Sequence, residues 1–119
     1  KTFSQSVEPS WFSVELKKDM PEDEAWKKLR DILVRRFDIE VIARSEGYLR
    51  TGWLYTWTGE YREDYRVRIT VKFQPEEKKV EVKTEAHYSK AGTWIQGYDS
   101  DLISLIKTDI MGSIGSVTR

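Results

Sequence analysis

Few side chains in this chain could do chemistry, and its only histidine is the first to consider. His87 lies between Glu85 and Tyr88 in an alternating stretch, at a position that a strand would turn outward. A catalytic histidine needs an orienting partner and a substrate pocket. The outer face of an antiparallel sheet offers neither, so we expect His87 to be a solvated surface residue.

Signatures of other active sites and metal sites are missing from the sequence. The chain has no cysteine, which excludes disulfides, zinc thiolates and thiol nucleophiles. Its serines lack the GxSxG pattern, and its glycines stand singly rather than in a phosphate loop. No spacing of histidine and carboxylates supplies several converging metal ligands. We therefore expect a protein that is not an enzyme, with no cofactor and no metal.

A row of charges is predicted on the outer faces of two neighbouring strands. The row consists of Arg66, Arg68 and Lys72 on one strand and of Glu81, Lys83 and Glu85 on the next. Cross-strand ion pairs explain such a row, and an anion-binding patch is the alternative. Lys plus Arg and Asp plus Glu number 20 each. A nucleic-acid-binding domain usually has a basic excess, so we expect no nucleic-acid partner.

Aromatic residues carry more information, because the chain has five tryptophans. Strand directions place the predicted loops 58–64 and 89–98 at the same end of the sheet. Four side chains should then gather at one rim, and these candidate partner-binding residues are Trp57, Tyr61, Trp94 and Ile95. They either fold over the open end of the core as a lid or form a binding edge, since Trp and Tyr anchors dominate interface energetics.

A second candidate surface is a stripe on the last predicted helix. Its members, which share one outer arc, are Leu105, Thr108, Gly112 and Gly115. Small residues permit close helix packing. The alternative is a fraying C-terminus that tolerates glycine.

Hydrophobic periodicity predicts the elements that must position these residues. Period-2 alternation predicts strands at 11–18, 39–43, 48–57, 65–73 and 79–88. Helical periodicity predicts amphipathic helices over 20–37 and from about 100 to 117, the second capped by Asp99. Residues 1–10 are polar and predict a flexible N-terminal lead-in, which leaves 11–119 as a single domain.

The order β-α-β-β-β-β-α predicts an α+β fold. The strands have one apolar face and one wet face, which is typical of an antiparallel sheet. Each helix has one apolar stripe, so both helices should pack on the same face of the sheet. The core should contain Trp26, Leu29, Ile32, Trp53, Ile69, Val71, Val82, Ile106 and Ile110.

One combination of segments resembles a known family. The run Gly47–Trp53 (GYLRTGW), the strand YRVRI and the closing amphipathic helix are similar to the BamC-like (NlpB/DapX-type) small envelope lipoproteins. BamC is a lipoprotein subunit of the outer-membrane β-barrel assembly machinery. The resemblance covers about residues 11–117 and implies a helix-grip arrangement. BamC has two such domains, whereas this chain has one. The lipid-bearing cysteine that the family carries near its mature N-terminus is not in this sequence, and trimming would account for that.

This resemblance implies a non-catalytic role in the bacterial cell envelope. The domain would face the periplasm, tethered to the outer membrane through an N-terminal lipid anchor that has been removed. Its partners would be other envelope proteins, including those of outer-membrane protein assembly. The chain begins at Lys1 rather than at methionine, so we expect either a fragment cut for expression or a mature protein whose leader was removed. No apolar run approaches the roughly 20 residues that span a bilayer.

Two functional hypotheses follow. The first is a protein–protein interaction module. The second is a carrier of a small apolar ligand, with a pocket between sheet and long helix lined by Trp53, Tyr55 and Trp57. So many large side chains in a short chain should fill their own interior at normal packing density, which favours the interaction module.

Overall fold

The computed structural model describes residues 3–118, apart from the side chains of Pro75 and Thr118, and it has the predicted α+β fold. Its helices are α1 (Glu22–Val34) and α2 (Ser100–Met111). Its strands are β1 (Phe3–Gln5), β2 (Ser10–Leu16), β3 (Ile39–Ala43), β4 (Tyr48–Thr51), β5 (Tyr65–Gln74), β6 (Lys79–Lys90), β7 (Thr93–Asp99) and β8 (Gly115–Thr118). Short 3-10 turns span Arg44–Glu46 and Pro75–Glu77.

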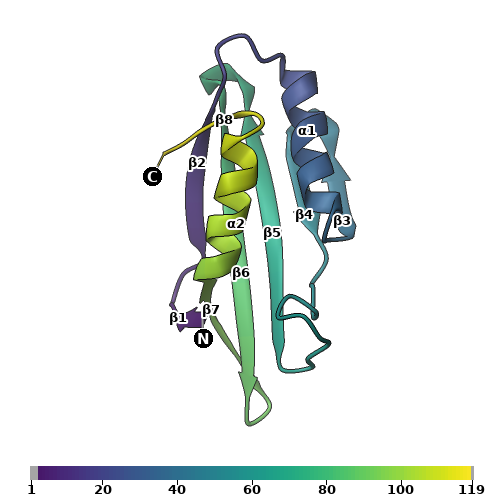
Figure 1. Ribbon diagram of the computed structural model, residues 1–119, viewed down its shortest axis with the longest axis vertical. Helices are drawn as coiled ribbons and strands as arrows, with labels where there is room; N and C mark the ends of the chain where they lie inside the picture. Colours follow the sequence, from purple (N-terminus) through teal and green to yellow (C-terminus); the bar gives the residue numbers. More distant parts are fainter. Residues whose placement is uncertain (1–2, 119) are drawn as a thin grey trace.

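The sheet is organised around β6, its longest strand (Figure 1). One edge of β6 pairs with the whole length of β5, from Gln74↔Lys79 to Tyr65↔Tyr88. The other edge is divided between β2 and β7. Beyond these, β4 and β3 extend the sheet past β5, β1 pairs with β7, and β8 pairs with β2. All of these pairings are antiparallel.

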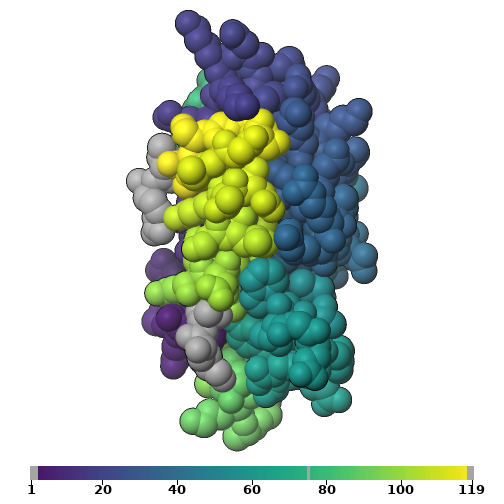
Figure 2. All heavy atoms as spheres, viewed as in Figure 1, coloured from purple at the N-terminus to yellow at the C-terminus, as the bar shows by residue number. Residues whose placement is uncertain are grey.

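Both helices lie on the same face of this sheet, as predicted (Figures 1 and 2). Helix α1 begins after Pro21 with three acidic residues that favour the positive end of the helix dipole. In α2, the Asp99 carboxylate caps the helix by accepting a hydrogen bond from the Leu102 N–H at 3.0 Å. The alternating residues of β5 and β6 and the apolar stripes of the helices form one buried core.

The predicted core is confirmed except at Trp53. A one-residue shift explains the exception: β4 pairs with β5 up to Arg50↔Thr70, and the chain then resumes pairing at Leu54↔Val67. Because side chains alternate between faces, one extra residue exchanges the two faces. Leu54 therefore packs against the core, while Trp53 contacts the outward residues Arg66 and Arg68. The predicted strand 48–57 ends at Thr51.

Both ends of the chain differ from the prediction. Residues 1–10 were expected to form a flexible lead-in; Lys1 and Thr2 lie outside the described residues, but β1 pairs with β7. Phe3 is part of this pairing, and its ring packs edge-on against Tyr65 at 5.9 Å. At the other end α2 stops at Met111 instead of continuing to 117. The chain then turns into β8.

The small-residue stripe on α2 is therefore not a helix face. Leu105, Thr108 and Gly112 belong to α2 or its end, whereas Gly115 begins β8 opposite Leu16. A Cβ at Gly115 would lie 2.0 Å from the Glu15 carbonyl oxygen. This glycine serves strand pairing at close range rather than helix packing.

Candidate functional site

The candidate site lies on the outer face of the sheet, opposite the helices, where β5, β6 and β7 run side by side. The β5–β6 register places Arg66 opposite His87 and Arg68 opposite Glu85. The predicted cross-strand ion pair between Arg68 and Glu85 is present, with 2.9 Å between Arg68 Nε and Glu85 Oε1. Glu85 is only 7% exposed, so this pair belongs to a packed layer rather than to a solvated surface.

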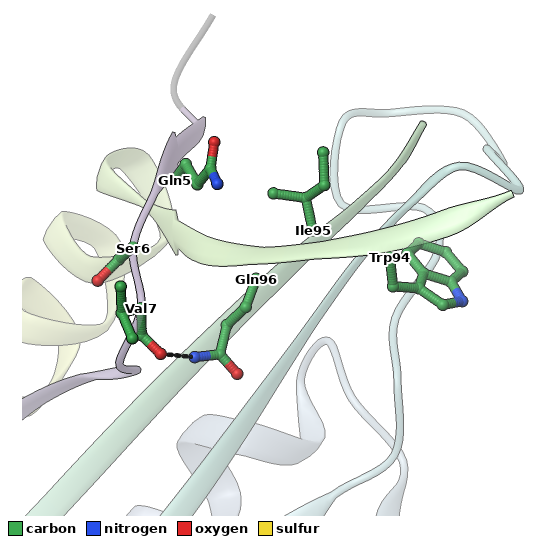
Figure 3. Close-up of a pocket in the computed structure, with 6 residues that line it drawn as sticks. All are labelled: Gln5, Ser6, Val7, Trp94, Ile95 and Gln96. Carbon is green, nitrogen blue, oxygen red and sulfur yellow. Dashed lines mark hydrogen bonds between the residues drawn. The ribbon is translucent and has the colours of Figure 1, made fainter. Parts of the chain in front are cut away.

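Strand β7 brings Trp94 to this layer. Residues 89–98 were predicted to be a loop, but β6 and β7 form a hairpin through Ala91-Gly92, whose φ angles are 53° and 80°. Positive φ at both positions suits a tight two-residue hairpin turn. Trp94 and Gln96 project from one side of β7 and Ile95 from the other (Figure 3). The β-branched and aromatic residues Thr93, Trp94 and Ile95, which follow Gly92 directly, were a signal for this second strand in the sequence.

Arg66 forms the centre of the site. Its Cζ lies 4.0 Å from the ring centroid of Trp53 and 3.9 Å from that of Trp94. Its Nη1 donates to the Tyr55 hydroxyl at 3.4 Å, and its Nη2 lies 3.2 Å from His87 Nδ1. We call the residues Trp53, Tyr55, Arg66, His87 and Trp94 the Arg66 cluster. Cation–π contacts strengthen when the cation is partly desolvated, so this guanidinium is held in place by its aromatic neighbours.

His87 is part of this packing and is not the solvated residue that we predicted. Its ring lies 4.6 Å from the Trp53 ring and 6.3 Å from the Trp94 ring. A guanidinium can only donate, so the contact with Arg66 makes Nδ1 an acceptor and assigns the neutral Nε2–H tautomer. Burial first, and then the charge of Arg66, lower the pKa of His87, while Glu85 raises it.

The charges around Arg66 are unbalanced. Arg68 also lies over Trp53, at 4.2 Å, but it has the Glu85 carboxylate as its partner. Within residues 3–118, no carboxylate oxygen lies within 4.0 Å of an Arg66 nitrogen. Arg66 Nε and His87 Nε2 are both buried without an acceptor among the described groups. The cluster thus combines a positive charge with unused hydrogen-bond donors.

The four residues predicted to share one rim are distributed over both faces. The two loops do meet, because the Ser89 N–H donates to the Asp64 carbonyl at 2.8 Å. Trp57, however, lies against α2 beside Leu105 and Thr108, and Ile95 points to the opposite side of β7 from Trp94. Tyr61 is 64% exposed and contacts Tyr55 with 5.9 Å between ring centroids. Of the four, Trp94 is the one that joins the Arg66 cluster.

A shallow hollow adjoins the cluster along β7. It has a volume of about 700 Å³, opens to solvent, and is lined by Gln5, Ser6, Val7, Trp94, Ile95 and Gln96 (Figure 3). The Gln96 side-chain amide donates to the Val7 carbonyl at 2.6 Å and holds the link between β1 and β2 beside β7. Val7 is 94% exposed and Trp94 is 37% exposed. The hollow therefore has an apolar side chain at each end.

Two of the side chains that were predicted to line the pocket of a carrier, Trp53 and Tyr55, do not lie between the sheet and the long helix. Trp53 faces away from the helices, and Tyr55 contacts Arg66 on the outer face. Between α1 and the sheet, Trp26 instead packs on Phe73 with 5.2 Å between ring centroids, next to buried Leu29 and Ile32. The described part of the chain contains no group of three or more His, Cys, Asp or Glu side chains that could hold a metal ion.

Comparison with known proteins adds no assignment to this geometry. Neither the protein-family models nor the curated proteins searched include a match to this chain. No helix among residues 3–118 is long and apolar enough to span a membrane. The Arg66 cluster and the hollow beside it are consequently the features that bear on function.

Proposed function

We propose that this protein is a non-catalytic protein–protein interaction module that binds its partner on the outer face of the sheet. The observation that carries the proposal is the Arg66 guanidinium, held about 4 Å from both Trp53 and Trp94 on the face that lacks helices. Tryptophan and arginine are the residues most enriched at the energetic centres of protein interfaces. Because Arg66 and Trp53 already hold each other in place, they can contribute to an interface with little further loss of side-chain freedom.

The contrast between the faces of the sheet supports this choice. The helix-covered face is filled by the protein's own side chains. On the outer face Trp94 keeps a partly exposed ring next to a hollow. An enzyme would require a nucleophile or an acid–base pair with a substrate pocket. The single histidine instead contacts Arg66 and packs at a tilt beside the Trp53 and Trp94 rings.

The cellular setting in the proposal rests on the resemblance to BamC-like lipoproteins. The domain would face the periplasm from an outer-membrane tether, and its partners would be envelope proteins linked to outer-membrane protein assembly. The full coding sequence tests this setting directly. A leader that ends in a cysteine, together with incorporation of labelled fatty acid, would support it, and a cytoplasmic gene product would contradict it.

The binding surface can be tested by photo-crosslinking in cells that express the full-length gene product. We would replace Trp94 with p-benzoylphenylalanine and, in a matched control, Met111, which is exposed on the opposite side of the fold. The proposal expects a discrete protein adduct from position 94 and none of the same mass from position 111. Equal adducts from both positions, or none from position 94, would contradict it.

A further inference from the structure

We infer that the partner presents an extended segment in which a carboxylate pairs with Arg66 and a neighbouring apolar side chain enters the hollow between Val7 and Trp94. This inference rests on the proposed function and adds the chemistry of the partner. Three features carry it: the uncompensated charge of Arg66 and the surplus of hydrogen-bond donors on the outer face, and the hollow along the edge of β7 next to them.

The three arginines that lie over tryptophans differ in whether a carboxylate compensates their charge. Arg44 lies 5.0 Å from the Trp26 ring centroid and is paired with Glu22 at 3.4 Å and with Asp23. Arg68 is paired with Glu85. Arg66 has the closest indole contacts of the three and, among the described side chains, no carboxylate. A partly buried guanidinium is stabilised by a carboxylate. A carboxylate from the partner would therefore give Arg66 the kind of ion pair that Arg44 and Arg68 already have.

The unused hydrogen-bond donors of the cluster also favour a carboxylate. Arg66 Nε–H and His87 Nε2–H lack acceptors within the described part of the molecule. A carboxylate has acceptors only, so it can satisfy such donors without bringing a donor that would compete with them. Both nitrogens are buried next to the Trp94 ring. Binding therefore requires the Trp94 side chain, close to the turn of the β6–β7 hairpin, to move aside.

The hollow supplies the second contact. Its apolar ends, Val7 and Trp94, are exposed, while the hydrogen bond from Gln96 to the Val7 carbonyl holds the link between β1 and β2 beside β7. Trp94 belongs to both the hollow and the Arg66 cluster. A segment that places a carboxylate on Arg66 would consequently present a second side chain, close by on the same side of the segment, to the hollow. In an extended chain, side chains two positions apart point to the same side, which gives the expected spacing.

A nucleic-acid strand is the competing occupant, because arginine and tryptophan also bind phosphates and bases. The observations favour a protein segment. The neighbouring Arg68 is already neutralised by Glu85, and the whole chain has no basic excess. Tight binding to a phosphate backbone depends on several uncompensated cations in a row.

The test uses the segment crosslinked to position 94. A synthetic peptide of that segment would be titrated onto the full chain by calorimetry, alongside a version in which each Asp and Glu is changed to Asn or Gln. We expect the amide version to bind at least about tenfold more weakly. We expect Arg66→Gln to weaken the acidic peptide by a similar factor and to leave binding of the amide version unchanged. Arg44→Gln, which removes a guanidinium already paired on the helix side, is the matched control and should change neither titration.

Arg66→Lys keeps the positive charge at this position and separates the effect of that charge on binding from the effect of the guanidinium geometry. Its ammonium cannot reproduce the planar stacking or the forked hydrogen bonds of a guanidinium, so we expect an affinity between those of the original chain and Arg66→Gln. Thermal unfolding of both variants checks that each is still folded at the temperature of the titrations. An adduct at position 94 with a segment that lacks carboxylates, or an acidic peptide that binds Arg66→Gln as tightly as the original chain, would overturn the inference and leave the proposed function standing. Crosslinking to nucleic acid, or no adduct at all, would overturn both.

Discussion

The two faces of β5 share one backbone but are covered by different parts of the chain. The inward residues Val67, Ile69 and Val71 are fully buried beneath the helices. The outward residues Arg66 and Arg68 are also packed, but against tryptophans supplied by the 52–64 loop and β7. The inner face is complete within the chain, whereas the outer face has an arginine with no carboxylate among the described residues. Packing by itself therefore does not distinguish the core from the candidate site, and charge compensation does.

The largest difference between the faces should be found by truncating one tryptophan on each. Trp26→Ala removes a buried ring packed on Phe73 and should lower the free energy of unfolding by ~3–5 kcal/mol. Trp53→Ala loses a half-buried ring and cation–π contacts and should cost about 1–2 kcal/mol. Urea unfolding of the two variants measures both values. Equal losses would mean that the outer layer is as much a core as the inner one.

The inner face also includes buried polar groups, among them a hydrogen bond from the Tyr65 hydroxyl to the Asp99 carboxylate. Burial and this bond raise the pKa of Tyr65 above its usual range. Tyr65→Phe leaves the buried Asp99 oxygen without that donor, although its other oxygen still caps α2, and should cost ~1–3 kcal/mol. Tyr61→Phe, at an exposed hydroxyl, is the control and should have no measurable effect on the unfolding free energy.

Trp94 should affect binding more than stability. Trp94→Ala removes a partly exposed ring near the end of a hairpin and should lower the free energy of unfolding by less than about 1 kcal/mol. Binding of the crosslinked segment should weaken by more than about 1 kcal/mol, because the ring borders both the Arg66 cluster and the hollow. Thermal unfolding and calorimetry measure the two effects. If Trp94→Ala lowers the free energy of unfolding but leaves the affinity for the segment unchanged, Trp94 covers the outer layer and does not bind the partner.

The smallest expected effect is a pH dependence at His87. The pKa of His87 is lowered in the folded state, so the unfolded chain binds the proton more readily. The stability contributed by the neutral ring is therefore present above about pH 6.5 and is lost as the pH falls from there through the folded pKa. His87→Gln removes the only histidine. The difference in unfolding free energy between the two chains should shrink or reverse as the pH is lowered from 7.5 to 5.5, and a constant difference would contradict the lowered pKa of His87.

Much of the fold could be predicted from local patterns. The period-2 runs of β5 and β6 identify their buried residues because a strand turns alternate side chains to opposite faces. The arc of apolar residues identifies the buried face of α1 in the same way. The Asp99 cap depends only on residues within one turn of α2. Each of these features depends on neighbours that are close in sequence.

The candidate site could be predicted only in part. The outward row containing Arg66, Arg68 and Glu85 was predicted, and so was the place of Trp94 outside the core. The Arg66 cluster was not, because it requires both the outward side of Trp53 and the existence of β7. The first depends on pairing Leu54 with Val67, and the second on the turn at Ala91-Gly92.

The sequence by itself therefore determined the two helices, the alternation of the long strands, most of the core and the balance of charge. Tertiary structure alone decided the one-residue shift after Thr51, the conversion of the last predicted helical turns into β8, and the meeting of Trp53, Arg66 and Trp94. The physical reason is that periodicity reports the environment of a residue relative to its near neighbours. Register shifts and strand partners are instead chosen by hydrogen bonds between distant segments, and a single extra residue is enough to move a tryptophan from the predicted core to the outer face.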